Sequence, residues 1–301
     1  MRLNLRQVEA FHAVMRTGSM TGAADLMAIT QPAVTRLIRD FEEAVSFALF
    51  ERRGNQLLPT AGATALVAEV DRSFIGLERI ARLAVGIRQH TAGSLRIAAM
   101  PAVANTLLPM FLADFLATRP QLQVTLLGVP SHLVAEMIAA GQADIGYAEG
   151  PLDRHGLDIQ SVPLASVVVL PQGHPLTAHN ILRPEDLANE QFIGLASGSL
   201  FAAGVDLAFA EVPRTIRIET GLSYTACALV AQGLGVCVVD PNTARDFVGR
   251  GLEVRPLSVH IDTGFLVIRS KTQRGGGLMD VFSSEFLAYN AGLVERLAEG
   301  L

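Results

Sequence analysis

The sequence has little of what marks secreted, membrane-spanning or metal-bound proteins. Of its 301 residues only two are cysteines, Cys227 and Cys237, which are too few for a disulfide framework and are not spaced as a metal-binding pair. Charged residues, glycine or proline interrupt every hydrophobic stretch before it reaches the length that crosses a bilayer. The N-terminus also lacks the basic and then apolar pattern of a signal peptide. We therefore expect a cytoplasmic protein that binds no metal, no cofactor and no membrane.

Motifs of catalysis are missing as well. The seven histidines are scattered, the only lysine is Lys271, and the chain has no phosphate-binding loop and no Ser-His-Asp order. We expect a protein that is not an enzyme. Neither cysteine has a basic residue beside it in the sequence that would lower the pKa of its thiol, so both are expected to be buried thiols.

A strongly basic charge is also absent. The net charge of -5 excludes a protein that coats nucleic acid nonspecifically. Residues 1–90 contain 11 basic and 9 acidic residues, and the remainder contains 13 and 20. Any DNA-binding part therefore lies near the N-terminus, where the small positive excess requires specific contacts and dimerisation instead of a diffuse basic field.

The start and stop signals present in the first part of the chain predict three helices. Asn4 begins a helix whose apolar periodicity stops at Gly18. Ser19 begins a second, short helix. Thr30 caps a third helix that has Pro32 in its first turn, where a missing N–H costs nothing.

The third helix has two unlike faces. Its apolar side consists of Val34, Leu37, Ile38, Phe41 and Val45, and its polar side of Gln31, Thr35, Arg36 and Arg39. The polar side chains cluster at the beginning of the helix, the part that a helix-turn-helix places in the major groove, and they can donate to base edges and phosphates. The alternative is an ordinary solvated face on a small helical bundle.

A short hairpin is predicted after the third helix. Residues 49–53 and 56–60 have strand character, and Gly54 with Asn55 forms a tight two-residue turn between them. This is the wing of a winged helix-turn-helix. Arg52 and Arg53 lie where a wing meets the sugar-phosphate backbone, and their charge positions the protein without selecting a sequence.

A long helix follows, because residues 60–89 contain no proline and keep an apolar seam. The seam consists of Leu66, Val70, Phe74, Leu77, Ile80, Ala84 and Ile87. Pairing with the same helix of a second subunit would bury it and would set two DNA-binding domains about 34 Å apart, one turn of DNA. The alternative is a helix that packs on the C-terminal part of its own chain.

Beyond residue 92 the pattern changes to alternating strands and helices, typical of an α/β domain. Strands are expected near 94–100, 123–129, 144–148, 167–170, 192–195, 216–219, 236–239 and 264–270, and helices near 106–118, 132–140, 200–209, 224–231, 243–248 and 279–289. The order predicts two lobes, about 92–163 with 265–301 and about 164–264, which two crossings connect. We expect a ligand in the cleft between them, beyond the carboxyl ends of the strands.

The residues at those strand ends are the candidate ligand contacts. They are Met100, Pro101, Ala102, Pro130, Ser131, Tyr147, Glu149, Gly150, Ser197, Gly198, Ser199, Phe201 and Asp240. Residues 197–199 precede a helix, so their N–H groups and hydroxyls suit a carboxylate, whereas Glu149 or Asp240 suits a cation. The alternative is that these are only turn and capping residues.

The N-terminal motifs resemble those of LysR-type transcriptional regulators. The likeness rests on AADL at 23–26, TQPAVTR at 30–36, FE at 41–42, LFER at 49–52 and PT at 59–60. It implies that Gln31, Pro32, Thr35 and Arg36 face the bases. It also implies that Thr21, Arg53 and Thr60 meet phosphates.

The chain is similar, more narrowly, to the regulators of octopine and nopaline catabolism. The matching stretches are GSMTG at 18–22, EVDR at 69–72, LRIAAMPA at 95–102, ADIGYA at 143–148, GPLDR at 150–154 and DP at 240–241. The resemblance implies an opine, arginine-like or other amino-acid-derived effector. It further implies an activator that binds double-stranded promoter DNA as a homodimer or homotetramer and acts on RNA polymerase.

The residues and the resemblance together predict three parts. These are a winged helix-turn-helix over 1–60, a linker helix over 61–91, and a two-lobed effector domain of the periplasmic-binding-protein-like α/β type over 92–301. A transport-binding protein, which has a similar two-lobed fold, is the alternative from another class. It would lack the helix-turn-helix and carry an export signal.

Overall fold

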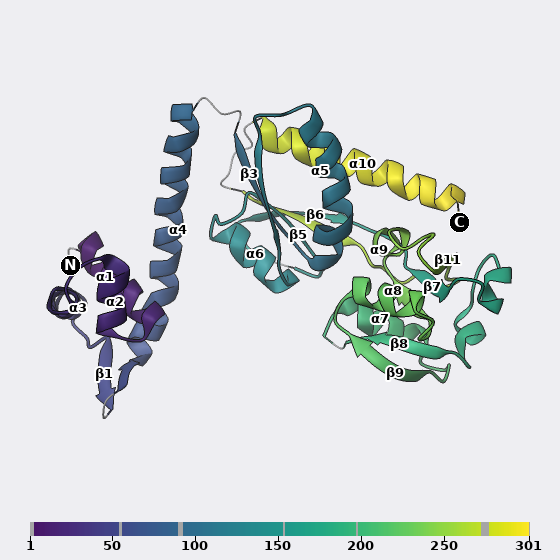
Figure 1. Ribbon diagram of the computed structural model, residues 1–301, viewed down its shortest axis with the longest axis horizontal. Coiled ribbons are helices and arrows are strands. Elements are labelled where there is room, and N and C mark those ends of the chain that lie inside the picture. The colour runs from purple at the N-terminus through teal and green to yellow at the C-terminus, as the bar shows by residue number, and fades with distance from the viewer. Residues whose placement is uncertain are drawn as a thin grey trace. The chain divides into compact units, whose positions relative to one another are not determined.

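The computed structural model describes residues 3–53, 56–89, 93–152, 154–196, 198–271 and 277–300. The chain forms two compact units, Met1–Ala84 and Val85–Leu301 (Figure 1). Among the described residues, no helix combines the length and the hydrophobicity that a membrane span requires.

The N-terminal unit consists of helices and one hairpin. Its elements are α1 (Leu5–Thr17), α2 (Met20–Met27), α3 (Gln31–Val45), β1 (Phe50–Arg53), β2 (Gln56–Pro59) and most of α4 (Ala61–Gln89). Gly18 ends α1 in the left-handed region at φ 69°, and the Ser19 hydroxyl accepts the N–H of Gly22 to cap α2, as predicted. Thr30 stands at the cap position of α3, but its side chain makes no capping hydrogen bond.

The hairpin is held to the end of α3. The carboxylate of Glu42 accepts the backbone N–H groups of Leu49 at 2.7 Å and Phe50 at 3.3 Å. β1 and β2 pair antiparallel with Arg53 opposite Gln56, and the predicted turn at residues 54 and 55 lies outside the described residues. Glu42 of α3 therefore fixes the position of the first strand of the wing.

The core of this unit lies between α1, α2 and α3. Its fully buried side chains include Phe11, Val34, Ile38 and Phe41, and the Phe11 and Phe41 rings meet edge to face at 5.6 Å. This is the apolar side predicted for the third helix. Since burying a side chain of this size contributes about 1.5–3 kcal/mol, the core holds α3 with its polar side outward.

The first half of α4 belongs to the same core. Val70 is buried there, with Leu66, Val67 and Phe74 packed around it. His12 of α1 stacks on Phe74 at 4.6 Å and contacts the carboxylate of Asp71 at 2.9 Å. The seam predicted for this helix is thus partly buried within its own N-terminal unit.

Lobe I of the C-terminal unit is built on a five-stranded sheet with the order β4-β3-β5-β12-β6. Its elements are β3 (Ser94–Ala99), η1 (Val103–Leu107), α5 (Leu108–Ala117), β4 (Gln123–Gly128), α6 (Ser131–Ala139), β5 (Ile145–Ala148), β6 (Leu157–Val162), β12 (Phe265–Ser270) and α10 (Leu278–Gly300). β3 is parallel to β4 and β5, whereas β12 is antiparallel to β5 and β6. Phe111 and Phe115 of α5 pack on Phe282 and Phe286 of α10 in its core.

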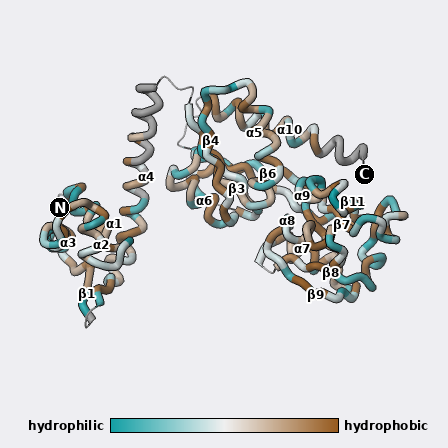
Figure 2. The backbone as a smooth tube through the Cα atoms, viewed as in Figure 1, coloured by the Kyte–Doolittle hydropathy of each residue, from teal (hydrophilic) through white to brown (hydrophobic). Residues whose placement is uncertain are grey.

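Lobe II contains a three-stranded antiparallel sheet, β10-β7-β11, and a parallel pair, β8 and β9. Its elements are β7 (Val167–Pro171), η2 (Pro175–Ala178), η3 (Pro184–Leu187), β8 (Gln191–Leu195), α7 (Leu200–Ala208), β9 (Thr215–Thr220), α8 (Ser223–Ala231), β10 (Cys237–Val239), α9 (Pro241–Arg245) and β11 (Leu252–Pro256). The backbone N–H of Ile193 on β8 donates to the carbonyl of Val236, which directly precedes β10, at 2.9 Å. This bond joins the parallel pair to the three-stranded sheet. The central strand β7 is a hydrophobic run that is buried over residues 167–170 (Figure 2).

Two chain segments cross between the lobes side by side. The N–H of Ser166 donates to the carbonyl of Ile261 at 3.0 Å, and the N–H of Thr263 donates to that of Leu164 at 2.8 Å. The crossings are therefore tied to each other by backbone hydrogen bonds, which is suitable for a hinge.

The structure differs from the sequence-based predictions at some elements. The helix expected over 106–118 begins earlier, as the π-helical turn η1, and the last helix extends beyond 289 as α10. The helix expected over 243–248 is α9, which is earlier in the chain and shorter. Strands β6 and β11 were not predicted.

Candidate functional site

The polar face of α3 is accessible over its whole length. The Arg36 and Arg39 side chains are 77% and 67% exposed, and the carboxylate nearest to both, that of Asp40, lies 3.9 Å from Arg36 and 3.8 Å from Arg39. Ion pairs this long and exposed contribute little, so both guanidinium groups are available to other acceptors. Gln31, also exposed, donates its amide to the Thr35 hydroxyl at 2.9 Å.

The other predicted DNA contacts lie around this helix. Thr21 on α2, Pro32 on α3 and Arg52 on β1 are exposed, and the side chain of Arg53 lies outside the described part of the chain. Thr60 differs from the others. Its hydroxyl donates to the Ala48 carbonyl at 2.8 Å and accepts an N–H from the first turn of α4 at 3.2 Å, so it has a structural role at the start of that helix.

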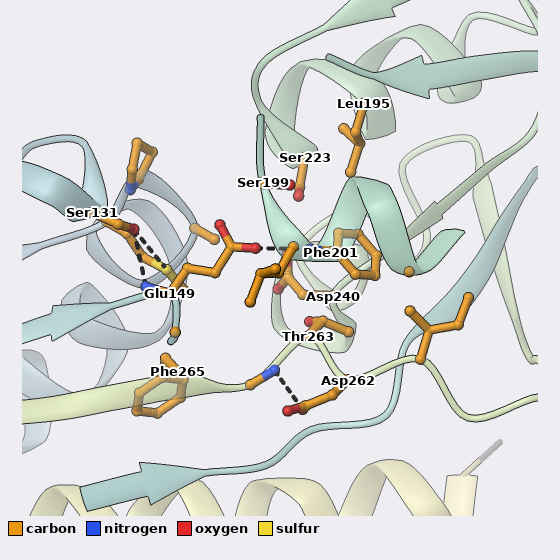
Figure 3. Close-up of a pocket in the computed structure, with 18 of the residues that line it drawn as sticks. Ser131, Glu149, Leu195, Ser199, Phe201, Ser223, Asp240, Asp262, Thr263 and Phe265 are labelled. Atoms are coloured by element: carbon orange, nitrogen blue, oxygen red, sulfur yellow. Dashed lines mark hydrogen bonds between the residues drawn. The ribbon is translucent and has the colours of Figure 1, made fainter. Parts of the chain in front are cut away.

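A cleft of about 1230 Å³ opens in the C-terminal unit, lined by residues of both lobes (Figure 3). Its lining includes the predicted Met100, Pro101, Ala102, Pro130, Ser131, Glu149, Gly150, Gly198, Ser199, Phe201 and Asp240. Ser197 lies outside the described residues. The structure therefore brings most of the candidate contacts together in one space.

Tyr147 is the exception, because its side chain lies in the core of lobe I and not in the cleft lining. It is fully buried, and its ring packs on those of Phe286 at 4.6 Å and Phe265 at 5.9 Å. Burial raises the pKa of its hydroxyl, which has no hydrogen-bond partner among the described residues. The position of Tyr147 on β5 explains this burial. Its side chain faces the α10 side of the sheet, and the chain reaches the cleft only beyond the strand end, from Glu149 onward.

Glu149 crosses the cleft from lobe I to lobe II. Its carboxylate accepts the N–H of Phe201 at 2.9 Å, in the first turn of α7, and its own N–H donates to the Ser131 hydroxyl at 3.0 Å (Figure 3). Ser199 accepts the next N–H of that turn, from Ala202, at 3.0 Å. The start of α7, predicted as a carboxylate site, is thus occupied by the protein's own carboxylate.

Asp240 is the most buried acid of the cleft, with 7% of its surface exposed. Its Oδ1 accepts the N–H of Thr243 at 2.8 Å and caps α9, while Oδ2 has no hydrogen-bond partner among the described residues. Burial raises the pKa of this carboxyl group, and the hydrogen bond from Thr243 opposes the increase.

Several lining residues were not predicted. Ser223 and Tyr224 follow β9, and the rule that ligands bind beyond strand ends would have found them had it been applied to this strand. Asp262 and Thr263 lie on the crossing between the lobes, for which the sequence gives no comparable signal. No group of metal-binding side chains large enough to hold an ion occurs within the described ranges.

The cysteines lie away from the cleft, buried in lobe II. Both are free thiols, as expected from the sequence. Burial raises the pKa of Cys237 to about 12 and that of Cys227 higher still.

Family models match both parts of the chain. Residues 5–64 match a bacterial regulatory helix-turn-helix protein model of the lysR family, and residues 88–289 match the LysR substrate binding domain. The chain belongs to the LysR family. This LysR regulator is a DNA-binding transcriptional regulator with a helix-turn-helix and an effector-binding domain, in agreement with the motifs at 23–60.

Two curated relatives match the LysR regulator over nearly its whole length. It is 47% identical over 294 residues to the octopine catabolism/uptake operon regulatory protein OccR of Rhizobium meliloti, with 98% of each chain covered. It is 36% identical to the transcriptional activator protein LysR of Escherichia coli K12, with 98% of this chain and 96% of the relative covered.

Solved structures agree on the fold. Full-length CbnR in complex with its target DNA matches the LysR regulator with a TM-score of 0.72 at 19% identity, over 95% of this chain and 98% of CbnR. At this identity the likeness establishes the shared architecture alone.

Proposed function

We propose that this LysR regulator binds promoter DNA as a homodimer or as a homotetramer of two dimers. Binding of an opine or another arginine-like, amino-acid-derived effector in the cleft then changes transcription by RNA polymerase. The protein acts in the cytoplasm, and the cleft binds its ligand without turning it over. The observation that carries the proposal is α3, whose apolar side is buried and whose polar side is open.

DNA contact follows from the chemistry of that polar side. Gln31 and Arg36 carry donors for base edges in the major groove, with Thr35 and Pro32 beside them. Thr21, Arg39 and the wing arginines Arg52 and Arg53 contact phosphates and fix the orientation of α3. Thr60 contributes to DNA binding by positioning the start of α4, because its hydroxyl is hydrogen-bonded to the Ala48 carbonyl and to the N–H of Ala63.

Dimerisation is supported by the second half of α4. Leu77 and Ile80 continue the apolar seam but are 40% and 65% exposed in the single chain. A helix of this length cannot bury them on the N-terminal core, which ends at Phe74. A second copy of the helix would cover them and would place two α3 helices about 34 Å apart along the DNA.

The effector class is supported by the relatives and by the cleft. OccR and the NocR proteins, 41–47% identical to this chain, are named as regulators of octopine catabolism or as NocR regulatory proteins. The cleft, at about 1230 Å³, is large enough for an amino-acid conjugate and has both hydroxyl and carboxylate groups in its lining. Since the lobes are joined by two short crossings, a ligand that contacts both lobes favours one arrangement over another.

A band-shift experiment tests the proposal. The purified full-length protein is incubated at physiological salt with the DNA upstream of its own gene, with and without octopine. We expect a specific complex whose mobility or DNA bend changes with octopine, because bending costs only a few kcal/mol. Absence of a specific complex would exclude the DNA-binding mechanism, and a complex that responds to no opine or arginine derivative would exclude the effector class.

A further inference from the structure

The cleft of the effector domain is acidic. Among the described residues that line it, the carboxylates are Glu149, Asp240 and Asp262, and none is lysine or arginine. The two lining histidines, His132 and His260, are exposed. An effector that enters this space therefore meets negative charge with no basic side chain from the described lining to balance it.

All three carboxylates accept a backbone N–H, and in two of them the bond joins segments that are far apart in the sequence. Asp262 accepts the N–H groups of Leu164 at 3.1 Å and Gly264 at 2.9 Å, which hold the crossing between the lobes together. Glu149 accepts the N–H of Phe201 across the cleft. Both acids thus hold separate segments of the protein together.

Asp240 differs from both. Oδ1 caps α9 through Thr243, whereas Oδ2 is buried and has no hydrogen-bond partner among the described residues. The hydroxyl of Ser223 lies close enough to help lower the pKa of the carboxyl group, but it does not reach hydrogen-bonding geometry with Oδ2. A buried carboxylate oxygen without a donor costs free energy, because the water it lost on folding has not been replaced.

A capping role alone does not account for this arrangement. Aspartate is common at helix N-caps, but the cap needs one oxygen, and asparagine or serine serves as well. Asp240 belongs to the cleft lining (Figure 3), and its second oxygen is buried in the cleft wall with no donor among the described residues.

We propose that Asp240 is the subsite for a cationic nitrogen of the effector, a guanidinium or a protonated amine, which donates to Oδ2 while Oδ1 keeps its bond to Thr243. This assignment rests on the proposed function of the cleft as the effector site, and it selects Asp240 over Glu149. It requires an effector with a positive group at the lobe II side. A neutral analogue of the same shape leaves Oδ2 without a charged donor and binds poorly.

The test is calorimetric titration of the full-length protein with four probes. L-arginine and octopine carry a guanidinium group, L-citrulline replaces it with a neutral urea of similar shape, and agmatine keeps the guanidinium but lacks the carboxylate. We expect the wild-type protein to bind arginine about 10- to 100-fold more tightly than citrulline, the effect of one charged hydrogen bond. Asp240→Asn should remove that preference and keep citrulline binding.

Asp206→Asn is the matched control, because it makes the same change in an exposed carboxylate on α7 that pairs with Arg214. It should keep the preference for arginine. Circular dichroism and DNA binding report whether each variant is folded.

The outcomes separate the two levels of the proposal. Equal binding of arginine and citrulline by the wild type, or an Asp240→Asn variant that keeps the preference, would overturn the Asp240 subsite while the effector class stands. Loss of both ligands in a folded Asp240→Asn variant would also overturn the subsite, because asparagine keeps the cap and citrulline binding should survive. Binding of agmatine without octopine would overturn the opine proposal and leave the subsite intact, and binding of none of the four probes would overturn both.

Discussion

Asp240 should make the stability of the ligand-free protein depend on pH. Burial raises the pKa of its carboxyl group, so the folded state holds a proton that the unfolded state releases above its ordinary pKa of about 3.9. Stability therefore falls as pH rises through the window between the unfolded and the folded pKa. Asp240→Asn should raise Tm at pH 7 by about 2–4 °C, which corresponds to ~1 kcal/mol, and should give no gain near pH 4.

Thermal melts of both proteins across this pH range check the expectation. Asp246 has a raised pKa as well, through burial opposed by Arg245, and it contributes equally to both curves. A variant less stable than the wild type at pH 7 and pH 4 alike would contradict the prediction. The residue that we propose as an effector contact thus lowers the stability of the protein without effector, as is common for binding sites.

Arg36 and Arg52 should differ in what they contribute to DNA binding. Arg36 lies on the polar face of α3, and Arg36→Ala should cost about 1–3 kcal/mol at the preferred site and relax the preference at one base pair. Arg52 lies on the wing, and Arg52→Ala should weaken binding to all sequences alike. Competition band shifts with single-base variants of the site distinguish the two patterns. Unchanged selectivity in Arg36→Ala would remove this residue from base recognition.

The long helix α4 has two halves with different partners. Leu77 and Ile80 lie in the half that is exposed in the single chain, so replacement of both with aspartate should leave the N-terminal core intact. Like charges placed across a paired seam oppose association. We expect the dimer to dissociate at least tenfold more readily in analytical ultracentrifugation. Thr64→Asp, on the opposite side of the helix, is the control, and a double variant that stays dimeric would place the interface elsewhere.

The crossing between the lobes depends on one glycine. A Cβ at Gly264 would overlap the backbone carbonyl of Val162, so Gly264→Ala must move one crossing away from the other. We expect a loss of about 1–3 kcal/mol in thermal unfolding, the usual cost of overpacking. Gly221→Ala is the matched control, since a Cβ there meets nothing within 4 Å. Equal stability of the two variants would contradict the close approach.

At the scale of single elements, the sequence predicted helices and strands best where the hydrophobic pattern lies within one continuous segment. The apolar side of α3 could be predicted from its helical periodicity, and the buried strand β7 from its continuous hydrophobic run. β6 and β11 were missed although each begins with an apolar-polar alternation, because the alternation is short and the strands are fixed by their pairing with β12 and β7. Their partners lie far away in the sequence, where local patterns give no signal.

The same limit applies to the site. Most of the residues predicted at strand ends line the cleft, since parallel strands bring their carboxyl ends to one edge, but they are a minority of its lining. They did not predict which side chain points inward, and the Tyr147 side chain lies in the core of lobe I instead. Asp240 was a candidate because it follows a strand. That its Oδ2 is buried without a hydrogen-bond partner among the described residues follows only from the folded structure.

At the scale of the whole molecule, the two units should respond to different ligands. Each has its own core, and the cleft lies entirely within Val85–Leu301. Octopine at about 100 times its Kd should stabilise that unit by about 2.7 kcal/mol and should leave the N-terminal unit unchanged. Calorimetric melts with octopine, and separately with operator DNA, check this. A single transition that both ligands shift equally would show that the units unfold together.

The bridge from Glu149 to Phe201 gives the sensor a built-in competitor. An effector carboxylate that uses the same N–H must displace a group that is covalently attached and therefore present at a high effective concentration. The affinity measured for such an effector then reflects the difference in binding free energy between its carboxylate and that of Glu149, and not the strength of its own contacts alone. The sensitivity of the promoter would be set by the chain as much as by the molecule it detects, and shortening or neutralising that one side chain would change the response threshold without altering the DNA.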